Sequence, residues 1–298
     1  MKYAFIERER HHHRVNTLCR VIAASKAGFY DWRERRLTCS TPPTARLALD
    51  TAARTAHTHG RQTYGPKRLR TALAEAGFKL SLASVKRLRR RLELRCKQIR
   101  KYKATTDSKH NHPIAANLLD RQFSQATAPN EVWVADITYI QTGEGWLYLA
   151  AVKDLFTCKI VGWAMDRDSH IRTELVSRAL FMAVKTQKPQ AGLIAHSDRG
   201  SQYASAQYRR LLNQFGMVQS MSRKGNCWDN APMESWFASL KKEEVYLTKY
   251  ATRAAARAAI FDYVEVFYNN IRRHSKIGNL SPAAFERNWR DAQLPKAA

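Results

Sequence analysis

The segment VWVADITYI, residues 132–140, is a run of β-branched and aromatic side chains with one carboxylate near its middle. β-Branched and aromatic residues favour a strand, whereas Asp is depleted from strands. Burying an unpaired carboxylate also costs several kcal/mol, so Asp136 needs a reason to be there. Two interpretations are open: a hydrogen-bonded polar residue at a bend of the strand, or a functional carboxylate.

The segments after this strand predict a mixed α/β domain. Two further strands, joined by short turns, complete an antiparallel meander, and the pattern then alternates between helices and short strands. Three antiparallel strands followed by β-α units on the same sheet is the element order of a ribonuclease-H-like fold, a mixed α/β layer architecture. The predicted elements are strands at 132–140, 146–152, 159–165, 192–196 and 217–220, and helices at 171–186, 206–215 and from 231 onward.

The first third of the chain predicts only helices. Residues 15–36 have helical spacing with a break at 23–25, which predicts two short helices, and residues 45–58 predict a longer one. The stretch 40–44 contains two prolines and predicts a connection between these helices.

The clearest motif outside the sheet domain is a helix-turn-helix pattern. Pro66 suits a first helical turn, Gly77 suits the position after a helix, and Ser81 suits the cap of the next one. The second helix combines an apolar stripe with a run of cations, which favours insertion into a DNA major groove over an ordinary helical hairpin with a solvated basic face. The stripe is Leu82, Val85, Leu88 and Leu92, and the cations are Lys86, Arg87, Arg89, Arg90 and Arg91.

Charge and cysteine usage narrow the class of protein. The 298 residues carry a formal net charge of +26, and residues 1–110 hold 27 Lys and Arg against 8 Asp and Glu. This asymmetry indicates a polyanionic partner. Nucleic acid is favoured over an anionic membrane surface, because no apolar run approaches the length of a spanning helix. Five cysteines without a CxxC pair and the lack of a signal peptide predict reduced thiols in a cytoplasmic protein.

Two more acids extend the pattern that begins with Asp136. Asp198 follows a predicted strand and precedes a glycine turn, where open α/β sheets bind ligands, although a turn or cap Asp is an equally good interpretation of that residue alone. Glu234 begins a predicted helix, where alone it would be an ordinary first-turn Glu. Together the three suit divalent-metal phosphodiester chemistry, which needs several converging carboxylates. Lys241, two helical turns after Glu234, suits a phosphate contact or is a surface lysine.

The motifs together resemble the second-reading-frame (OrfB) transposase of the insertion-sequence-three family, a branch of the DDE transposase and retroviral integrase superfamily. In this pattern, 35 residues separate Asp198 from Glu234. The zinc-binding His/His/Cys/Cys module of retroviral integrases is missing from the sequence. The resemblance is collinear over nearly the whole chain and is carried by SKAGFYDWRER (25–35), YGPKRLR (64–70), VWVADITYI (132–140), HSDRGSQYAS (196–205), KGNCWDNAPMESWFASLKKE (224–243) and YNNIRRHSKIGNLSPAAFE (268–286).

The resemblance implies a transposase that cuts and rejoins the DNA ends of an insertion element. It implies that Asp136, Asp198 and Glu234 hold two Mg²⁺ ions, with Mn²⁺ as an alternative, while water attacks one strand at an element end. The freed 3′-hydroxyl then attacks a second phosphodiester, without a covalent protein intermediate. It further implies terminal-repeat and target DNA as partners, a homo-oligomer on DNA, fusion to a first-frame product by frameshifting, and association with the bacterial nucleoid when bound.

The resulting domain expectation has five parts. They are an N-terminal helical, helix-turn-helix-like segment (1–44), a helix-turn-helix DNA-binding region (45–112), a linker (113–128), an integrase-type catalytic domain (129–290) and a tail (291–298). Two other functions compete with transposition: a nuclease on the same fold that cuts but never joins, and a non-catalytic DNA-binding regulator. The residues expected at DNA are Lys241, Lys67, Arg68, Lys86, Arg87, Arg89, Arg90, Arg91, Asn230, Arg272 and Arg273.

Other chemistry-bearing residues have weaker claims. His196, beside Asp198, is favoured as a core histidine over a proton carrier. Four tryptophans of the sheet domain suit stacking on unpaired bases: Trp133, Trp146, Trp228 and Trp236. For Trp133 and Trp146, packing in the core is favoured over stacking. The rival carboxylates are Asp154, Asp166, Asp168 and Asp229.

Overall fold

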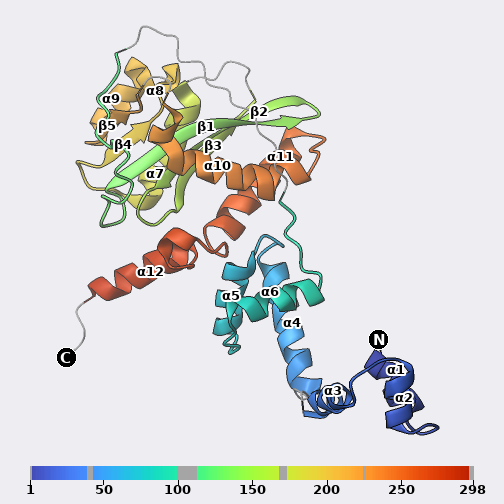
Figure 1. Cartoon of the computed structure of the whole chain (residues 1–298). Coiled ribbons are helices and arrows are strands. Elements are labelled where there is room, and N and C mark those ends of the chain that lie inside the picture. The colour runs from blue at the N-terminus through green and yellow to red at the C-terminus, as the bar shows by residue number, and fades with distance from the viewer. Residues whose placement is uncertain (1, 39–42, 99–112, 168–172, 224–225, 295–298) are drawn as a thin grey trace.

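Residues 132–294 form a mixed β-sheet with helices on both faces, and residues 2–91 are helical where the structure describes them (Figure 1). The computed structural model describes residues 2–38, 43–98, 113–167, 173–223 and 226–294. The strands are β1 (Val132–Thr142), β2 (Gly145–Asp154), β3 (Ile160–Asp166), β4 (Ile194–Ser197) and β5 (Val218–Met221). The α-helices are α1 (Lys2–Glu9), α2 (Val15–Val21), α3 (Lys26–Thr38), α4 (Pro43–His59), α5 (Pro66–Glu75), α6 (Leu82–Arg91), α7 (Thr173–Gln187), α8 (Ser201–Ala204), α9 (Ala206–Gln214), α10 (Ala231–Glu243), α11 (Arg253–Phe261) and α12 (Pro282–Gln293), with 3₁₀ turns at Cys227–Asn230, Val245–Leu247 and Ser275–Ile277 and a π-helix at Asp262–Tyr268.

The sheet has the strand order β3-β2-β1-β4-β5. Strands β1, β2 and β3 are antiparallel neighbours, while β4 and β5 run parallel to β1. This is the ribonuclease-H-like arrangement expected from the element order, and every predicted strand lies within two residues of its observed bounds. The fold expectation is therefore confirmed.

The pairing of β1 changes at Asp136. Strand β4 follows β1 only as far as Ala135, whose partner is Ser197, whereas β2 follows β1 to Thr142. The last parallel pair is Ala135 and Ser197, and each of these residues is followed by an aspartate, Asp136 on β1 and Asp198 after β4. No described strand pairs with the β4 side of β1 from residue 136 to 141, so β1 is central in its first half and an edge strand in its second.

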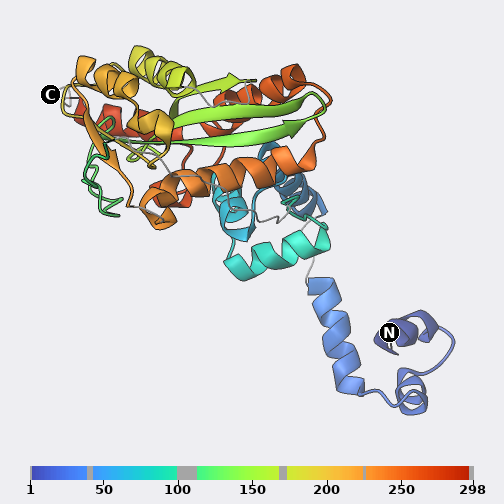
Figure 2. The ribbon, with the colours of Figure 1, turned by 90° about the horizontal axis from the view of Figure 1, so that it is seen from above.

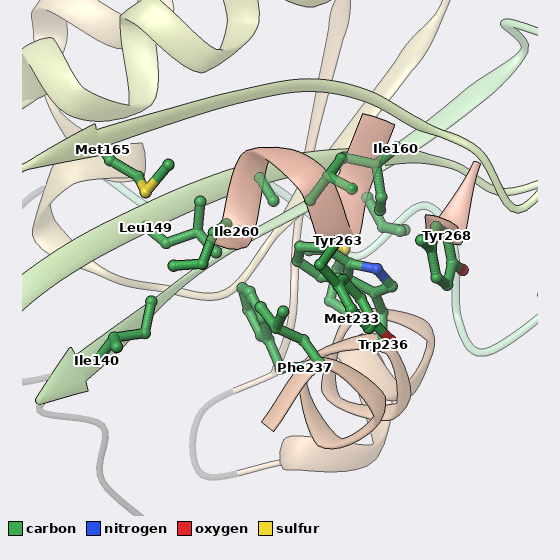
Figure 3. Packing of buried hydrophobic residues seen from close by; sticks show 14 of the residues in the cluster. Ile140, Leu149, Ile160, Met165, Met233, Trp236, Phe237, Ile260, Tyr263 and Tyr268 are labelled. Atoms are coloured by element: carbon green, nitrogen blue, oxygen red, sulfur yellow. The ribbon is translucent and has the colours of Figure 1, made fainter. Parts of the chain in front are cut away.

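Helices cover both faces of the sheet, because β1 sends alternate side chains to opposite sides. Val134 packs in the core formed with α10, α11 and the π-helix, while its neighbours Trp133 and Ala135 pack with α7 and α9. Figures 1 and 2 show these two layers on either side of the strands. Figure 3 shows the α10 layer, in which the ring of Trp236 of α10 lies edge-on to that of Tyr268 of the π-helix, with 6.0 Å between the ring centroids.

The predicted helix-turn-helix is present as α5 and α6. Pro66 is the first residue of α5, and Gly77, just past its end, has a φ of 90°, the left-handed conformation that glycine adopts without strain. Ser81 caps α6 by accepting a hydrogen bond from the Ser84 amide at 3.1 Å. These three terminal residues therefore act as the sequence predicts, and the apolar stripe of α6 packs against α5 and α4.

The first three helices form a separate small unit with a core of its own. Helices α2 and α3 match the predicted pair, whereas α1 was not predicted, because its eight residues bury only Ile6 and show little periodicity. In Figures 1 and 2 this unit lies at the end of α4 that is remote from the sheet. Among the described helices, none is both long and apolar enough to cross a membrane.

The helix-turn-helix region packs directly on the sheet domain. The Tyr64 hydroxyl donates to the Ile271 carbonyl at 3.0 Å, and Arg61 forms an ion pair with Asp262 at 2.7 Å. Arg61 also lies over the ring of Phe267, with its guanidinium carbon 4.6 Å from the ring centroid. The two parts of the chain are therefore joined at the π-helix and the residues that follow it.

A buried ion pair lies beneath this interface. Arg272 donates to both carboxylate oxygens of Glu243 at 2.7 Å, and the Tyr263 hydroxyl donates to the same carboxylate at 2.9 Å. Arg272 and Glu243 are only 4% and 2% exposed, so each compensates the buried charge of the other. Gln98, after the helix-turn-helix, adds a hydrogen bond to Glu243 at 3.0 Å.

The segment predicted as a linker, 113–128, is instead packed on the sheet domain in its described course. Leu119 is fully buried, and the Leu118 amide donates to the Ser220 hydroxyl at 2.9 Å. Asn117 and Arg121 both donate to the buried carboxylate of Asp229. Polar composition suggested a solvated connection, but these side chains use their polarity to bind the domain. The predicted tail also begins too early, because α12 continues to residue 293.

Replacing Arg272 with Gln should lower the free energy of unfolding by about 3 kcal/mol, because it leaves the Glu243 carboxylate buried without its cation. Urea unfolding followed by circular dichroism measures the loss. Arg8→Gln is the matched control, since Arg8 also pairs with a glutamate but its side chain is 72% exposed. Equal stabilities of the two variants would contradict a structural role for the buried pair.

Candidate active site

The end of the β1–β4 ladder places two carboxylates at neighbouring strand positions. Asp136 follows Ala135 on β1, and Asp198 follows Ser197, the last residue of β4. Because the strands run parallel, the residues after the last paired positions leave the ladder at the same edge. Glu234 lies in the first turn of α10, the helix that covers this side of the sheet.

The three acids are close enough for their charges to interact. Burial raises the pKa of Asp136 well above its usual range, and the charge of Asp198 raises it further, with a smaller contribution from Glu234. The Ile137 amide, which donates to Asp136 Oδ1 at 2.7 Å, and the ammonium of Lys241 act in the opposite direction. Partial burial also raises the pKa of Glu234. The site therefore disfavours negative charge on Asp136 until a cation is added.

A tight turn holds Asp198. Its Oδ1 accepts a hydrogen bond from the Gly200 amide at 2.9 Å. A β-carbon on residue 200 would lie 3.0 Å from that same oxygen and 2.9 Å from Oε1 of Gln202. The glycine of the motif therefore allows the carboxylate to fold back over its own turn.

Oxygen donors dominate the candidate site, which suits a hard divalent cation better than a soft metal. As the side chains stand, no group of three His, Cys, Asp or Glu within the described residues is close enough together to hold a metal ion. Asp136 and Asp198 are fixed by strand and turn, whereas Glu234 is solvent-exposed. The donor chemistry thus fits a divalent ion, with Glu234 as the member least constrained by its own contacts.

Lys241 lies beside the acids, on the same helix as Glu234. Its Nζ is 5.5 Å from the centroid of the Tyr139 ring, across the free edge of β1. Desolvation lowers the pKa of Lys241, and the charge of Asp136 partly offsets this effect. The ammonium is therefore half-buried at the site rather than on an open surface.

Asn230 is not where a DNA-contacting residue is expected. It is 4% exposed, and its Nδ2 donates to the Ala135 carbonyl at 3.2 Å. The expectation of a DNA contact is wrong for this residue in the described structure, because its side chain points into the protein, toward the strand that carries Asp136.

Lys153 is a site neighbour that sequence reasoning missed. Its Nζ donates to the Pro232 carbonyl, in the first turn of α10, at 3.1 Å, and the residue is 4% exposed. Burial lowers the pKa of Lys153 to about 8. The available signal was a lone cation in the strand GWLYLAAVKD, residues 145–154, by the same logic that singled out Asp136.

The rival carboxylates have structural partners. Asp154 accepts hydrogen bonds from Asn130 and Thr157 at the turn after β2. Asp229 is fully buried, and its bonds from Arg223 and Arg121 hold its pKa far below the usual range. Asp166 pairs with Arg178, and Asp168 lies outside the described residues.

The four tryptophans near the motifs differ in burial, and one of the two expected in the core is exposed. Trp133 is buried as favoured, but Trp146 is 46% exposed, so its expected core position is wrong. Trp228, in the 3₁₀ turn before α10, is 67% exposed, whereas Trp236 is buried in the α10 core and is not available to stack on bases. Trp146 is exposed because it lies at the hairpin end of β2, beyond the helices of that face; it packs edge-on against Tyr139.

The basic residues of the helix-turn-helix differ in how free they are. Lys86, Arg87 and Arg90 are exposed on α6. Arg89 donates to the sulfur of Cys96, and Arg91 forms a bidentate pair with Asp50 of α4. On α5, Lys67 is exposed and Arg68 is half-buried against the sheet domain, where desolvation lowers its pKa.

The two arginines expected at DNA near the C-terminus also differ. Arg272 is buried on Glu243, so the prediction that it contacts DNA is wrong in this structure. Arg273 pairs with Glu75 of α5 and donates to the Asn279 carbonyl. Both side chains hold the interface between the two parts of the chain.

Known proteins match this chain along its length. An integrase core domain family model matches residues 126–227, and a second integrase core domain model matches residues 234–289. The chain is 49% identical over 272 residues to the insertion element IS600 uncharacterized 31 kDa protein of Shigella sonnei, covering 91% of this chain and 98% of that protein. It is 40% identical over 286 residues to the transposase InsF for insertion sequence IS3A of Escherichia coli (strain K12), covering 96% and 98%. A solved simian T-cell lymphotropic virus intasome in complex with PP2A regulatory subunit B56 gamma is similar over 78% of each chain, at 14% identity and a TM-score of 0.47.

His196, next to the acids in sequence, should make stability fall with pH. Its ring nitrogens lie 2.9 and 3.2 Å from the hydroxyls of Ser220 and Ser222, and burial lowers its pKa to about 4. In the unfolded chain this histidine takes up a proton as the pH falls below its ordinary pKa of 6.5, whereas in the folded protein the buried ring stays neutral until the pH nears 4. Stability is therefore lost as the pH falls from 6.5 toward 4. His196→Gln should remove about 2 kcal/mol of this loss, measured by urea unfolding across the range.

The exposed His12 is the control for this prediction. Unfolding of His12→Gln at the same pH values controls for the loss of an imidazole outside the packed cores. Part of the loss should persist in the His196 variant, because burial also lowers the pKa of His274, to about 3. Identical pH profiles for wild type and His196→Gln would contradict the buried, neutral histidine.

Proposed function

This chain belongs to the IS3 family of insertion-sequence transposases, which are DDE-type polynucleotidyl transferases, and we propose that Asp136, Asp198 and Glu234 form its catalytic site. One observation carries the proposal. The β1–β4 ladder ends immediately before both aspartates, and the charges of Asp198 and Glu234 both act on Asp136. Like charges that act on one another at a partly buried carboxylate are costly unless a cation binds there, so their presence indicates a binding role.

The proposed cofactor is a divalent cation, Mg²⁺ as a pair of ions, with Mn²⁺ as the alternative. When bound, such ions activate the attacking oxygen and stabilise the leaving oxygen of a phosphodiester. The carboxylates supply hard oxygen ligands, and the glycine turn orients one oxygen of Asp198 through the Gly200 amide. The ammonium of Lys241 adds a positive charge beside Asp136, and its proposed role is to contact a DNA phosphate.

We propose that DNA is bound in two places by this chain. At the catalytic site, the strand to be cut lies at the free edge of β1, beside Lys241. At the N-terminal part, the exposed cations of α6 contact the backbone of a terminal repeat while the helix occupies the major groove. Lys67 on α5 extends this surface. A homo-oligomer that holds two element ends, and fusion to a first-frame product, complete the proposed assembly.

The finer reaction is proposed as 3′-end cleavage followed by strand transfer. A labelled terminal-repeat duplex, incubated with the protein and Mg²⁺, separates this from the two competing functions. Joined product supports strand transfer, cleavage without joining supports a nuclease, and binding without either supports a regulator. In the proposed reaction, water and then the 3′-hydroxyl are the nucleophiles, so no protein–DNA adduct should be trapped at any stage.

Asp136→Asn, Asp198→Asn and Glu234→Gln should each lower the rate of end cleavage by at least about 100-fold, because each removes charge that the transition state needs. Asp154→Asn is the matched control, a buried aspartate of the same sheet whose hydrogen bonds come from Asn130, before β1, and Thr157, after β2. Asp136→Asn should not reduce the stability of the metal-free protein, because it removes an unfavourably buried charge. Full joining activity in all three variants would refute the assignment.

Changing Lys86, Arg87 and Arg90 together to Gln should weaken binding to terminal-repeat DNA and flatten its salt dependence. Each lost phosphate contact reduces the slope of log K against log[salt] by about 0.9, so the slope should fall by up to about 3. Titrations between about 50 and 200 mM salt measure it. Arg91→Gln is the control, because Arg91 is already paired with Asp50, and a triple variant with the wild-type slope would exclude α6 from the interface.

A further inference from the structure

The first turn of α10 is anchored by two buried polar side chains that the proposed chemistry does not use. We propose that Asn230 and Lys153 are positioning residues, which fix this turn against β1 and β2 and thereby set where Glu234 meets the two aspartates. The proposal deepens the proposed function and rests on it, since Glu234 must belong to the site for its position to matter.

Asn230 occupies the N-cap position of α10, yet its side chain does not cap the helix. An asparagine there ordinarily accepts a hydrogen bond from an amide of the first turn, which stabilises the helix. Here its Nδ2 instead donates to the carbonyl of Ala135. That carbonyl belongs to the last residue of the β1–β4 ladder, directly before Asp136. The side chain therefore links the start of α10 to the strand position that carries the first carboxylate.

The contacts of Asn230 differ from those of an asparagine that only holds the fold together. Its Oδ1 is buried and has no hydrogen-bond partner among the described residues. Asn269 provides the contrast, because it is equally buried but uses both polar atoms, donating to the Ile160 carbonyl and accepting from the Ile160 amide. An unpaired buried oxygen is energetically unfavourable. Asn230 therefore makes its hydrogen bond to β1 although its own Oδ1 is left without a donor among the described residues.

Lys153 anchors the same turn from the next strand. Its register partner on β1 is Val134, so its side chain lies on the α10 face of the sheet, as does that of Asp136. Its Nζ donates to the Pro232 carbonyl, two residues before Glu234. Among the described residues, no carboxylate lies within ion-pair distance of this buried ammonium. An apolar side chain would fill the core at lower cost, which indicates that the bond to α10 is what the lysine provides.

The two anchors tie the start of α10 to two neighbouring strands. Asn230 reaches from the helix start to β1, and Lys153 reaches from β2 to residue 232. Glu234 follows within the same turn, and among the described residues none is hydrogen-bonded to its side chain, so the two contacts are what tie this part of the helix to the strands. A displacement of about 1 Å in a reacting group is enough to cost about 100-fold in rate.

The test compares Asn230→Ala and Lys153→Met with Asn269→Ala, a matched loss of a buried side chain that does not touch α10. Two measurements use the full chain without DNA or turnover. Hydrogen exchange in the metal-free protein reports the amides of residues 235–238, and calorimetry reports the binding of Mn²⁺. We expect faster exchange at these amides and about tenfold weaker Mn²⁺ binding for the first two variants, as for other residues that orient metal ligands. Asn269→Ala should change neither, although it lowers the melting temperature.

The conservative variants Asn230→Ser and Lys153→Arg retain a donor and should lie between wild type and the full deletions; they also serve if a deletion variant fails to fold. Wild-type exchange and wild-type Mn²⁺ affinity in the variants that fold would overturn the proposal, as would equal effects of Asn269→Ala. Glu234→Gln distinguishes a failure of the proposed metal-binding role of Glu234 from a failure of the proposed anchoring by Asn230 and Lys153. If that variant binds Mn²⁺ as wild type does, the proposed function of Glu234 fails, while exchange at residues 235–238 still decides whether the anchors hold the turn.

Discussion

The parallel pairing of β1 with β4 is the constraint on which the rest of the molecule depends. Because it stops at Ala135 and Ser197, the two strands release Asp136 and Asp198 at the same level of the sheet. A ladder one residue longer would bind the aspartate backbones into the sheet, and a shift of one residue would turn Asp136 to the other face. The site is thus a consequence of strand register before it is a consequence of any side-chain contact.

Helix α10 extends this constraint across the domain. Glu234 lies in its first turn, Lys241 lies beside the acids, and Glu243 at its end binds Arg272 beneath the helix-turn-helix region. One helix therefore carries an acid of the candidate site, a cation and the carboxylate that anchors the helix-turn-helix region. Any displacement of the N-terminal helices on that anchor is transmitted along the helix axis, since a three-turn α-helix resists bending.

The fold was predictable from sequence, because its signals are local: alternation of apolar residues and turn chemistry. A carboxylate inside an apolar strand singled out Asp136 in the same local way, whereas Asp198 and Glu234 were singled out only by the motifs that resemble the family. What could not be predicted depends on contacts distant in sequence. Arg272 and Arg273 are neighbours, but Arg272 is buried on Glu243 of α10, whereas Arg273 pairs with Glu75 of α5. From sequence, Asn230 suits a helix cap or a DNA contact, and only the structure shows its hydrogen bond to β1. Likewise Lys153 is only a residue near the end of a strand until the structure shows its hydrogen bond to α10.

The half-exposed edge of β1 has a consequence for the solubility of the protein. An uncovered strand with free backbone groups is a template for pairing with another chain, and hence for aggregation. In the described structure this edge, residues 136–141, lies next to the half-buried ammonium of Lys241. A positive charge beside an uncovered strand opposes pairing with a second copy of the chain, so a variant that removes this charge risks precipitation before it loses its fold.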